Sequence, residues 1–246
     1  TITANNIINQ TDLQATGFID IIANDTFKNG TLDGDNSDIQ IVAGTNLNIT
    51  AENLISNYSI LSSGNDLSLI SLSNNVNNNI NAEIIGGSGT ATLQALKGTV
   101  NQNSLHSLVS NGDLTLDVED FVNTGRVDID GDFTLNVSND LTNDAYAMIY
   151  SSGDMELNVV NNLTNNSGAV IYSEGDLTIQ KYATTSDNYD ASDNRSNLVE
   201  KISGEIISYA GDMRIDAVTL NNKREIDPFN ALIDPQNDGT LFAYGG

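Results

Sequence analysis

The stretch "AMIYSSGDMELNVVNNLTNN", residues 147–166, is followed closely by "AVIYSEGDLTIQ", residues 169–180, and the two can be laid over one another. The pattern I-Y-S-x-G-D-[M/L]-x-[L/I] returns after 22 residues, from Gly153 to Gly175. Such a short period is typical of proteins built from stacked repeats, in which each unit packs on its neighbours.

The glycine of this motif marks nine copies of the unit along the chain. The copies lie at Gly17, Gly44, Gly64, Gly89, Gly112, Gly131, Gly153, Gly175 and Gly211. The shortest spacings define a unit of about 19–22 residues. The longer spacings indicate the same unit with an insertion.

Apolar residues recur at fixed positions around each glycine. Two and four residues after it lie the pairs Leu114/Leu116, Phe133/Leu135, Met155/Leu157, Leu177/Ile179 and Met213/Ile215, and, one residue later, Leu47/Ile49 and Leu67/Leu69. Four residues before it lie Leu13, Ile60, Leu108, Val127, Ile149, Ile171 and Ile207. Apolar residues that alternate with polar ones predict short strands with one buried face.

An asparagine follows an apolar residue at a spacing of two in most copies, as in Leu163/Asn165. Asparagine tolerates the left-handed backbone of a sharp corner, and stacked asparagines can bond to one another as a ladder. We therefore predict a structural corner ladder made of Asn123, Asn143, Asn165 and Asn222.

Short strands, tight corners and this period predict an all-β fold, a right-handed parallel β-helix of about nine coils. The rod is expected over residues 1–224, with insertions near 33–38, 74–83 and 181–200. Residues 225–246 contain both prolines and break the alternation, which indicates a cap or a linker. The opening "TITANNIINQ" resembles a strand rather than a signal peptide, so we expect an internal segment of a longer protein.

The composition excludes several function classes. The 246 residues include 33 acidic and 9 basic side chains, a formal net charge of −24, which repels nucleic acids and anionic membranes. We therefore expect no nucleic-acid partner. The absence of cysteine suits a chain that crosses a membrane unfolded on its way out of the cell.

The consensus G-D-L-T-L-x-V-x-N-x-L-T-N-x-x-A-x-I-x-S, clearest across residues 108–180, resembles the repeats of the filamentous haemagglutinin family. These are large exoproteins exported by two-partner secretion, among them adhesins and contact-dependent growth inhibition effectors. The resemblance implies a right-handed β-helix at the surface of a Gram-negative bacterium, exported through an outer-membrane transporter. In growth inhibition effectors such repeats form a stalk, and a neighbouring region binds a receptor on the target cell.

We accordingly expect a non-enzymatic, monomeric segment of a secreted cell-surface filament. It would be the stalk or receptor-binding region of a growth inhibition effector, with an outer-membrane protein or glycan as the receptor. Two alternatives are a host-directed adhesin and a polysaccharide-active β-helix enzyme. A lyase acting on acidic sugars needs basic residues, and residues 1–180 contain only Lys28, Lys97 and Arg126.

The insertion at 181–200, "KYATTSDNYDASDNRSNLVE", contains the candidate receptor-binding residues Tyr182, Tyr189 and Arg195. Tyrosine and arginine are enriched where protein surfaces bind partners. The alternative is a loop that contacts nothing.

The aspartates that follow the motif glycines predict a column along one edge of the rod. They are Asp113, Asp132, Asp154, Asp176 and Asp212. We expect each carboxylate to accept backbone N–H bonds at its corner while it faces water. Calcium binding is the lesser hypothesis, because the nine-residue calcium repeat is absent. His106 is the only histidine, so we expect no metal site and no cofactor.

Tyr150 and Tyr172 each lie three residues before a motif glycine, next to the buried aliphatic column. They are expected on the outer face of the rod. They could form a platform on which a carbohydrate stacks, or an aromatic ladder that stiffens the rod.

Overall fold

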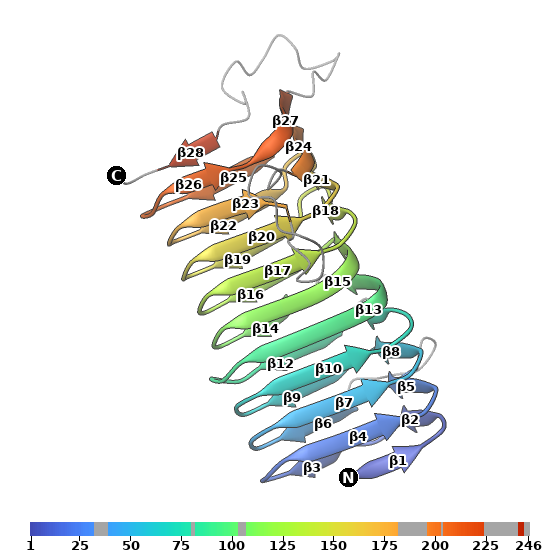
Figure 1. Ribbon diagram of the computed structural model, residues 1–246. Helices are drawn as coiled ribbons and strands as arrows, with labels where there is room; N and C mark the ends of the chain where they lie inside the picture. The colour runs from blue at the N-terminus through green and yellow to red at the C-terminus, as the bar shows by residue number, and fades with distance from the viewer. Residues whose placement is uncertain are drawn as a thin grey trace, which may run out of the picture.

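The computed structural model is a parallel β-solenoid in which every strand pairs with a strand of the coil before or after it (Figure 1). It describes residues 1–31, 39–79, 82–102, 107–181, 196–202, 204–223 and 241–243. Within these ranges there are strands and turns but no helix. The prediction of an all-β parallel solenoid is confirmed.

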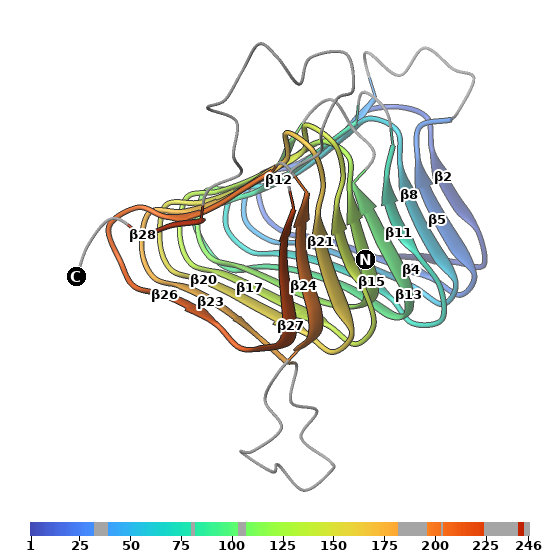
Figure 2. The ribbon, with the colours of Figure 1, turned by 90° about the horizontal axis from the view of Figure 1, so that it is seen from above.

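Each coil contributes to three faces, which enclose a single core when the rod is viewed along its axis (Figure 2). The first face contains β1 (Ile2–Ala4), β4 (Ile19–Ala23), β7 (Leu47–Ala51), β10 (Leu67–Ser71), β13 (Ala91–Gln102), β15 (Leu114–Asn123), β17 (Phe133–Val137), β20 (Met155–Val159), β23 (Leu177–Gln180) and β26 (Met213–Ile215). The second contains β2 (Ile7–Asn9), β5 (Thr26–Asn29), β8 (Leu54–Asn57), β11 (Val76–Asn78), the ends of β13 and β15, β18 (Leu141–Asn143), β21 (Asn162–Asn165), β24 (Ser196–Ile202) and β27 (Ala217–Lys223).

The third face is a separate sheet of ten strands, one from each coil. Its members are β3 (Leu13–Ala15), β6 (Gln40–Ala43), β9 (Ile60–Ser63), β12 (Glu83–Gly86), β14 (Ser107–Ser110), β16 (Arg126–Ile129), β19 (Met148–Ser151), β22 (Val170–Ser173), β25 (Glu205–Ser208) and β28 (Leu241–Ala243). The first two faces form one 18-stranded sheet, because β13 and β15 bend from one face into the other. In Figure 2 the chain turns counterclockwise as it approaches the viewer, so the solenoid is right-handed.

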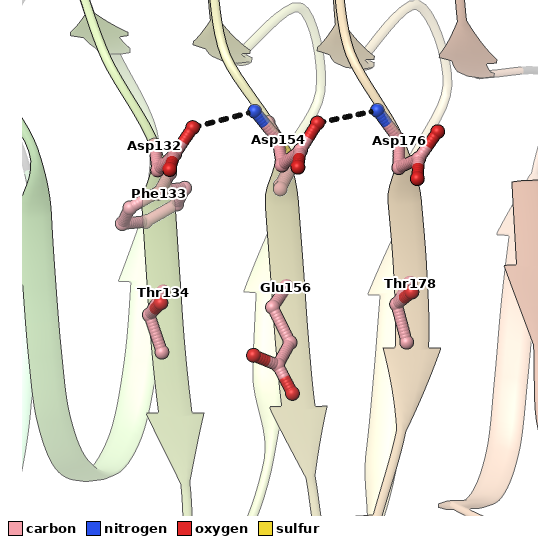
Figure 3. Close-up of a pocket in the computed structure, with 8 residues that line it drawn as sticks. Asp132, Phe133, Thr134, Asp154, Glu156, Asp176 and Thr178 are labelled. Carbon is pink, nitrogen blue, oxygen red and sulfur yellow. Dashed lines mark hydrogen bonds between the residues drawn. The ribbon is translucent and has the colours of Figure 1, made fainter. Parts of the chain in front are cut away.

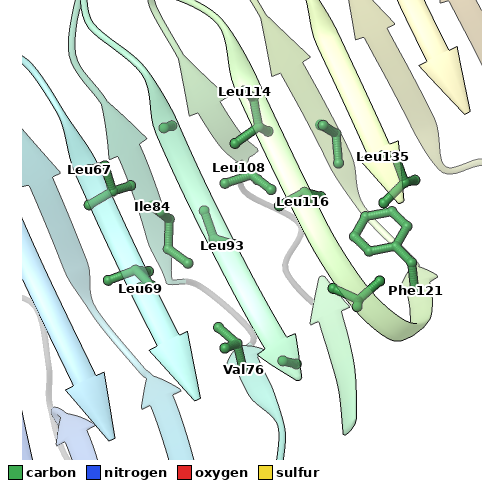
Figure 4. Close-up of a cluster of buried hydrophobic side chains, with 14 of the residues drawn as sticks. Leu67, Leu69, Val76, Ile84, Leu93, Leu108, Leu114, Leu116, Phe121 and Leu135 are labelled. Carbon is green, nitrogen blue, oxygen red and sulfur yellow. The ribbon is translucent and has the colours of Figure 1, made fainter. Parts of the chain in front are cut away.

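The core is a stack of apolar columns that run the length of the rod. Side chains two apart along a strand point inward, and in-register pairing places each one on its counterpart in the next coil, as with Leu114 on Phe133. Figure 4 shows the central part of this stack, where Leu116, Phe121 and Leu135 are fully buried. The apolar pairs predicted after the motif glycines occupy these columns.

Two residues expected in the column before the glycines face outward instead. Ile60 and Ile207 are half-buried on the outer surface, and their neighbours Leu61 and Ile206 are fully buried. The distance from the last buried residue of the strand to the glycine differs by one in these coils. Gly64 directly follows Ser63 and Gly211 lies three residues after Ser208, whereas in most other coils this distance is two residues. Because strand side chains alternate, counting four residues back from these two glycines reaches an outward-facing side chain instead of a buried one.

Two of the three predicted insertions contain strands of the rod. In the range 74–83, Val76–Asn78 forms β11 and Ala82 is buried, so most of it belongs to the rod. In the range 181–200, β24 begins at Ser196 and pairs with β21 and β27. The range 33–38 lies outside the described residues. Near the end of the chain, β28 adds a strand to the third face, so the rod continues into residues expected to be a cap or linker.

The motif glycines are required because consecutive corners touch through their backbones. A Cβ atom on Gly64 would lie 2.3 Å from the carbonyl oxygen of Gly44, and one on Gly44 would lie 2.3 Å from the carbonyl oxygen of Thr16. Among the described glycines only Gly30 and Gly168 have a positive φ. Close approach, rather than an unusual backbone conformation, therefore explains the repeat of glycine.

Candidate functional site

The three residues predicted to bind a receptor, Tyr182, Tyr189 and Arg195, lie outside the described residues. β23 ends at Gln180 and β24 begins at Ser196, so residues 182–195 connect the first face to the second. On the described surface, the prominent features are ladders of side chains that join successive coils.

A ladder of buried asparagines runs through the corner between the second and third faces. Asn123 donates a hydrogen bond from its side-chain nitrogen to the side-chain oxygen of Asn143 (2.8 Å), and Asn143 donates in the same way to Asn165 (2.8 Å). The same nitrogens also donate to backbone carbonyls of the next coil, including that of Val170 (3.1 Å). A second run links Asn9, Asn29, Asn57 and Asn78.

These asparagines do not have the left-handed backbone of a sharp corner, but Asn123, Asn143 and Asn165 do bond to one another. The ladder asparagines end β-strands, and the only described residue other than glycine with a positive φ is Tyr146. Asparagine suits this position because its side-chain nitrogen donates to the asparagine of the next coil and its side-chain oxygen accepts from the asparagine of the preceding coil. The same nitrogen also donates to a backbone carbonyl at the corner. Asn222 occupies the same register position through Lys201, and its side chain lies outside the described residues.

The aspartate column forms a ladder of its own, in which each carboxylate bonds to the backbone of the next coil (Figure 3). Oδ1 of Asp132 accepts the N–H of Asp154 (2.9 Å), and Oδ1 of Asp154 accepts the N–H of Asp176 (2.9 Å). The bonds from Asp132 to Asp113 and from Asp212 to Asp176 have the same form. A shallow hollow of about 320 Å³ on the first face is lined by three of these aspartates and by side chains of the strands that follow them: Asp132, Asp154, Asp176, Thr134, Glu156 and Thr178.

A third ladder, which the sequence analysis did not single out, lies on the outer side of the first face. Asn136 donates to Asp117 (2.7 Å), Asn158 donates to Asn136 (2.9 Å), and Gln180 donates to Asn158 (2.9 Å). The signal was present in the repeat, since all four residues lie five positions after a motif glycine. Alternation identified their outward position but not their mutual bonding.

The serine of the opening motif also joins two coils. The hydroxyls of Ser151, Ser173 and Ser208 donate to the carbonyl oxygens of Gly131 (2.6 Å), Gly153 (2.8 Å) and Gly175 (2.9 Å) in the preceding coils. All three serines are fully buried. The letters S-x-G-D thus describe one corner: a serine that reaches back, a glycine without a side chain, and an aspartate that accepts from the coil ahead.

The tyrosines of the third face form an aromatic stack. The ring centroids of Tyr150 and Tyr172 lie 5.7 Å apart with an interplanar angle of 20°, and Tyr209 extends the stack at 6.1 Å and 26°. Because both faces of the Tyr172 ring are covered by the other two rings, a sugar cannot stack on it. The geometry therefore favours the ladder over the carbohydrate platform. Tyr209 lies two residues before its glycine instead of three, so the spacing pattern did not reveal it.

Tyr150 is also held by a carboxylate. Its hydroxyl donates a hydrogen bond to Oε1 of Glu174 (2.6 Å). This bond, partial burial and the charge of Glu174 raise the pKa of Tyr150 to about 12, because the phenolate would lose the bond and lie beside a negative charge. Burial and the charge of Glu174 also raise the pKa of Tyr172.

The described ranges contain neither a metal-binding cluster nor a membrane-spanning helix. No group of three or more His, Asp or Glu side chains there is arranged to hold a metal ion. No helix in the same part of the chain is long and apolar enough to cross a membrane. His106 lies outside the described residues.

Comparisons with known proteins identify no relative. No protein-family model, no curated protein and no solved structure matches the chain. The resemblance to filamentous haemagglutinin repeats accordingly rests on the repeat pattern. The parallel β-solenoid is compatible with that resemblance.

Proposed function

We propose that this chain is a non-enzymatic rod segment of a secreted cell-surface protein of a Gram-negative bacterium. The observation that supports the proposal is the axial bonding between coils. Backbone pairing, asparagine, aspartate and serine ladders and the tyrosine stack all run along the same direction. Such an arrangement resists bending and separation of the coils. With a strand spacing of about 4.8 Å, ten stacked strands span on the order of 43 Å.

Within that role, the leading candidate is the stalk or receptor-binding region of a contact-dependent growth inhibition effector. Its repeat pattern resembles that family, and its acidic surface suits a filament that stays dispersed outside the cell. The receptor would be an outer-membrane protein or glycan on a neighbouring bacterium. The segment at 182–195 is the candidate contact, since it contains Tyr182, Tyr189 and Arg195. A host-directed adhesin is the alternative.

A binding assay on whole cells tests this proposal. Purified protein is titrated against related bacteria and against host cells, beside a variant in which residues 182–195 are replaced by a Gly/Ser linker of equal length. A matched control replaces residues 32–38 in the same way. These bounds leave β23 and β24 intact, so the fold is retained. Saturable binding to bacteria that only the first replacement removes supports a receptor-binding region.

The other outcomes are also informative. Saturable binding to host cells alone favours an adhesin, and binding to neither cell type leaves the stalk. Turnover of an acidic polysaccharide by the purified protein would overturn the non-enzymatic proposal. A scattering envelope that is compact instead of elongated would overturn the rod.

A further inference from the structure

The tyrosine stack places oxidisable phenols of successive coils against one another. Tyr150 and Tyr172 are paired in register on β19 and β22, and their rings lie 5.7 Å apart and nearly parallel. Both side chains are only half-buried, so small oxidants can reach them. We propose that Tyr150 and Tyr172 are a site of oxidative cross-linking, at which a one-electron oxidant joins two successive coils through a dityrosine bond.

In-register pairing makes this pair easier to cross-link than other tyrosines. Their strands are hydrogen-bonded neighbours at the usual separation of about 4.8 Å, so the two backbones hold the phenols together whatever the concentration of the protein. Tyr146, in contrast, is 85% exposed at a corner and stacks on no other tyrosine among the described residues. Tyr209 can take part as a second partner of Tyr172, because its ring lies 6.1 Å away on the other face.

Glu174 gives the oxidation of Tyr150 a proton acceptor. A phenol that loses an electron becomes a strong acid, and its proton must leave together with the electron. The hydroxyl of Tyr150 already donates to Oε1 of Glu174 at 2.6 Å, which is the geometry that proton transfer requires. The carboxylate can then pass this proton to water, because the bond lies at the exposed surface. The proton of Tyr172 leaves directly to solvent.

The chemistry balances with hydrogen peroxide as the terminal oxidant and a haem peroxidase as the one-electron relay. Each phenol loses one electron and one proton, and gives a tyrosyl radical. The two radicals form one carbon–carbon bond between ring carbons ortho to the hydroxyls, and the two hydrogens on these carbons move to the oxygens and restore the phenols. The two electrons and two protons that are released convert one hydrogen peroxide to two waters.

The bond would act as a covalent staple along the rod. The chain contains no cysteine, so it has no disulfide for this purpose. A link between positions 150 and 172 closes one coil of the solenoid and restricts the unfolded chain, which raises stability in the same way as other cross-links. This inference is independent of the proposed function, since it depends only on the stack and on Glu174.

The test treats dilute, folded protein with a haem peroxidase and hydrogen peroxide and then maps the products. Cleavage before aspartate separates residues 144–153 from residues 154–175, because Asp144, Asp154 and Asp176 flank them. The expected product is these two peptides joined with a loss of two hydrogen atoms, in protein that remains monomeric. Oxidation of the nearby Met148 adds oxygen instead and is distinguished by mass.

Three conservative variants make the assignment specific. Tyr172→Phe keeps an aromatic ring in the stack but should abolish the joined product and the rise in the denaturant midpoint that follows oxidation. Tyr146→Phe, the control that shares a peptide with Tyr150, should leave both unchanged. Glu174→Gln should slow formation of the product severalfold, because the amide accepts a proton poorly. Circular dichroism checks that all three variants fold.

Other results would overturn the inference. Cross-links that form only between molecules, or a joined product that disappears in Tyr146→Phe, would show that the stack is not the reactive site. A product that forms equally fast in Glu174→Gln would refute the role of the carboxylate. No dityrosine in the wild-type protein, under conditions that cross-link free tyrosine, would refute the site as a whole.

Discussion

At the scale of single residues, the ladder asparagines are the positions where we expect substitution to be tolerated least. Asn143 is fully buried, accepts from Asn123 and donates to Asn165 and to a carbonyl of the next coil. Asn143→Leu fills the space but leaves the amide of Asn123 and the oxygen of Asn165 without this partner. Since each buried unsatisfied group costs about 1–3 kcal/mol, we expect a loss of about 3 kcal/mol in the free energy of unfolding.

Urea denaturation measures this loss, and Asn166→Ala is the matched control. Asn166 lies beside Asn165 and donates to Asp144 at an exposed position, so its replacement should change stability by less than about 0.5 kcal/mol. Equal effects of the two substitutions would show that the ladder contributes nothing beyond its surface bonds.

Tyr150 predicts a pH dependence at the same scale. Its pKa in the folded state is about 12, above the ordinary value of 10.0, so folding favours the protonated phenol. The resulting stabilisation is complete below pH 10 and is lost as the pH rises toward 12. The ultraviolet difference spectrum between the wild-type protein and Tyr150→Phe should therefore titrate with a midpoint above the ordinary value of 10.0. In Glu174→Gln the midpoint should fall toward 10, and an unchanged midpoint would contradict the assigned cause.

At the scale of the strand and its corner, alternation predicted most of what the structure shows. The pairs Leu114/Leu116 and Met155/Leu157 are buried as expected, because a fixed distance from the glycine preserves their register. The position four residues before the glycine failed for Ile60 and Ile207, because the glycine of these coils lies one residue nearer to or farther from the strand than in most coils. The place of the glycine within the turn cannot be read from alternation alone. Single bonds between coils, such as that from Tyr150 to Glu174, also depend on side-chain geometry that the repeat does not encode.

The corner glycines allow a matched test at this scale. A Cβ atom on Gly64 would lie 2.3 Å from a backbone oxygen of the preceding coil, whereas one on Gly17 would meet nothing within 4 Å. Gly64→Ala should therefore cost on the order of 3 kcal/mol, because the backbone must move to relieve the overlap. Gly17→Ala changes a glycine in the corresponding turn of the first coil and should be nearly neutral. Chemical denaturation measures the free energy of unfolding of both variants. Similar losses in the two would indicate that the backbone freedom of glycine, rather than close approach, explains the repeat.

At the scale of the whole molecule, the solenoid has no single centre, and each coil is stabilised by the two coils beside it. The net charge of −24 opposes compaction along the whole length, and each carboxylate of the aspartate ladder is compensated locally by one backbone N–H. Stability is therefore a property of neighbouring coils, and it should vary with position along the rod.

Hydrogen exchange should reveal this gradient. All residues of β1 are exposed, because this strand has a partner on one side only, whereas β17 buries alternate residues between β15 and β20. Amides of β1–β3 should exchange at least tenfold faster than those of β15–β20, since local opening at an edge breaks one interface instead of two. Exchange measured by mass spectrometry on the folded protein tests the difference. Uniform protection along the rod would mean that the coils open together, and that the axial ladders couple them more strongly than pairing between neighbours requires.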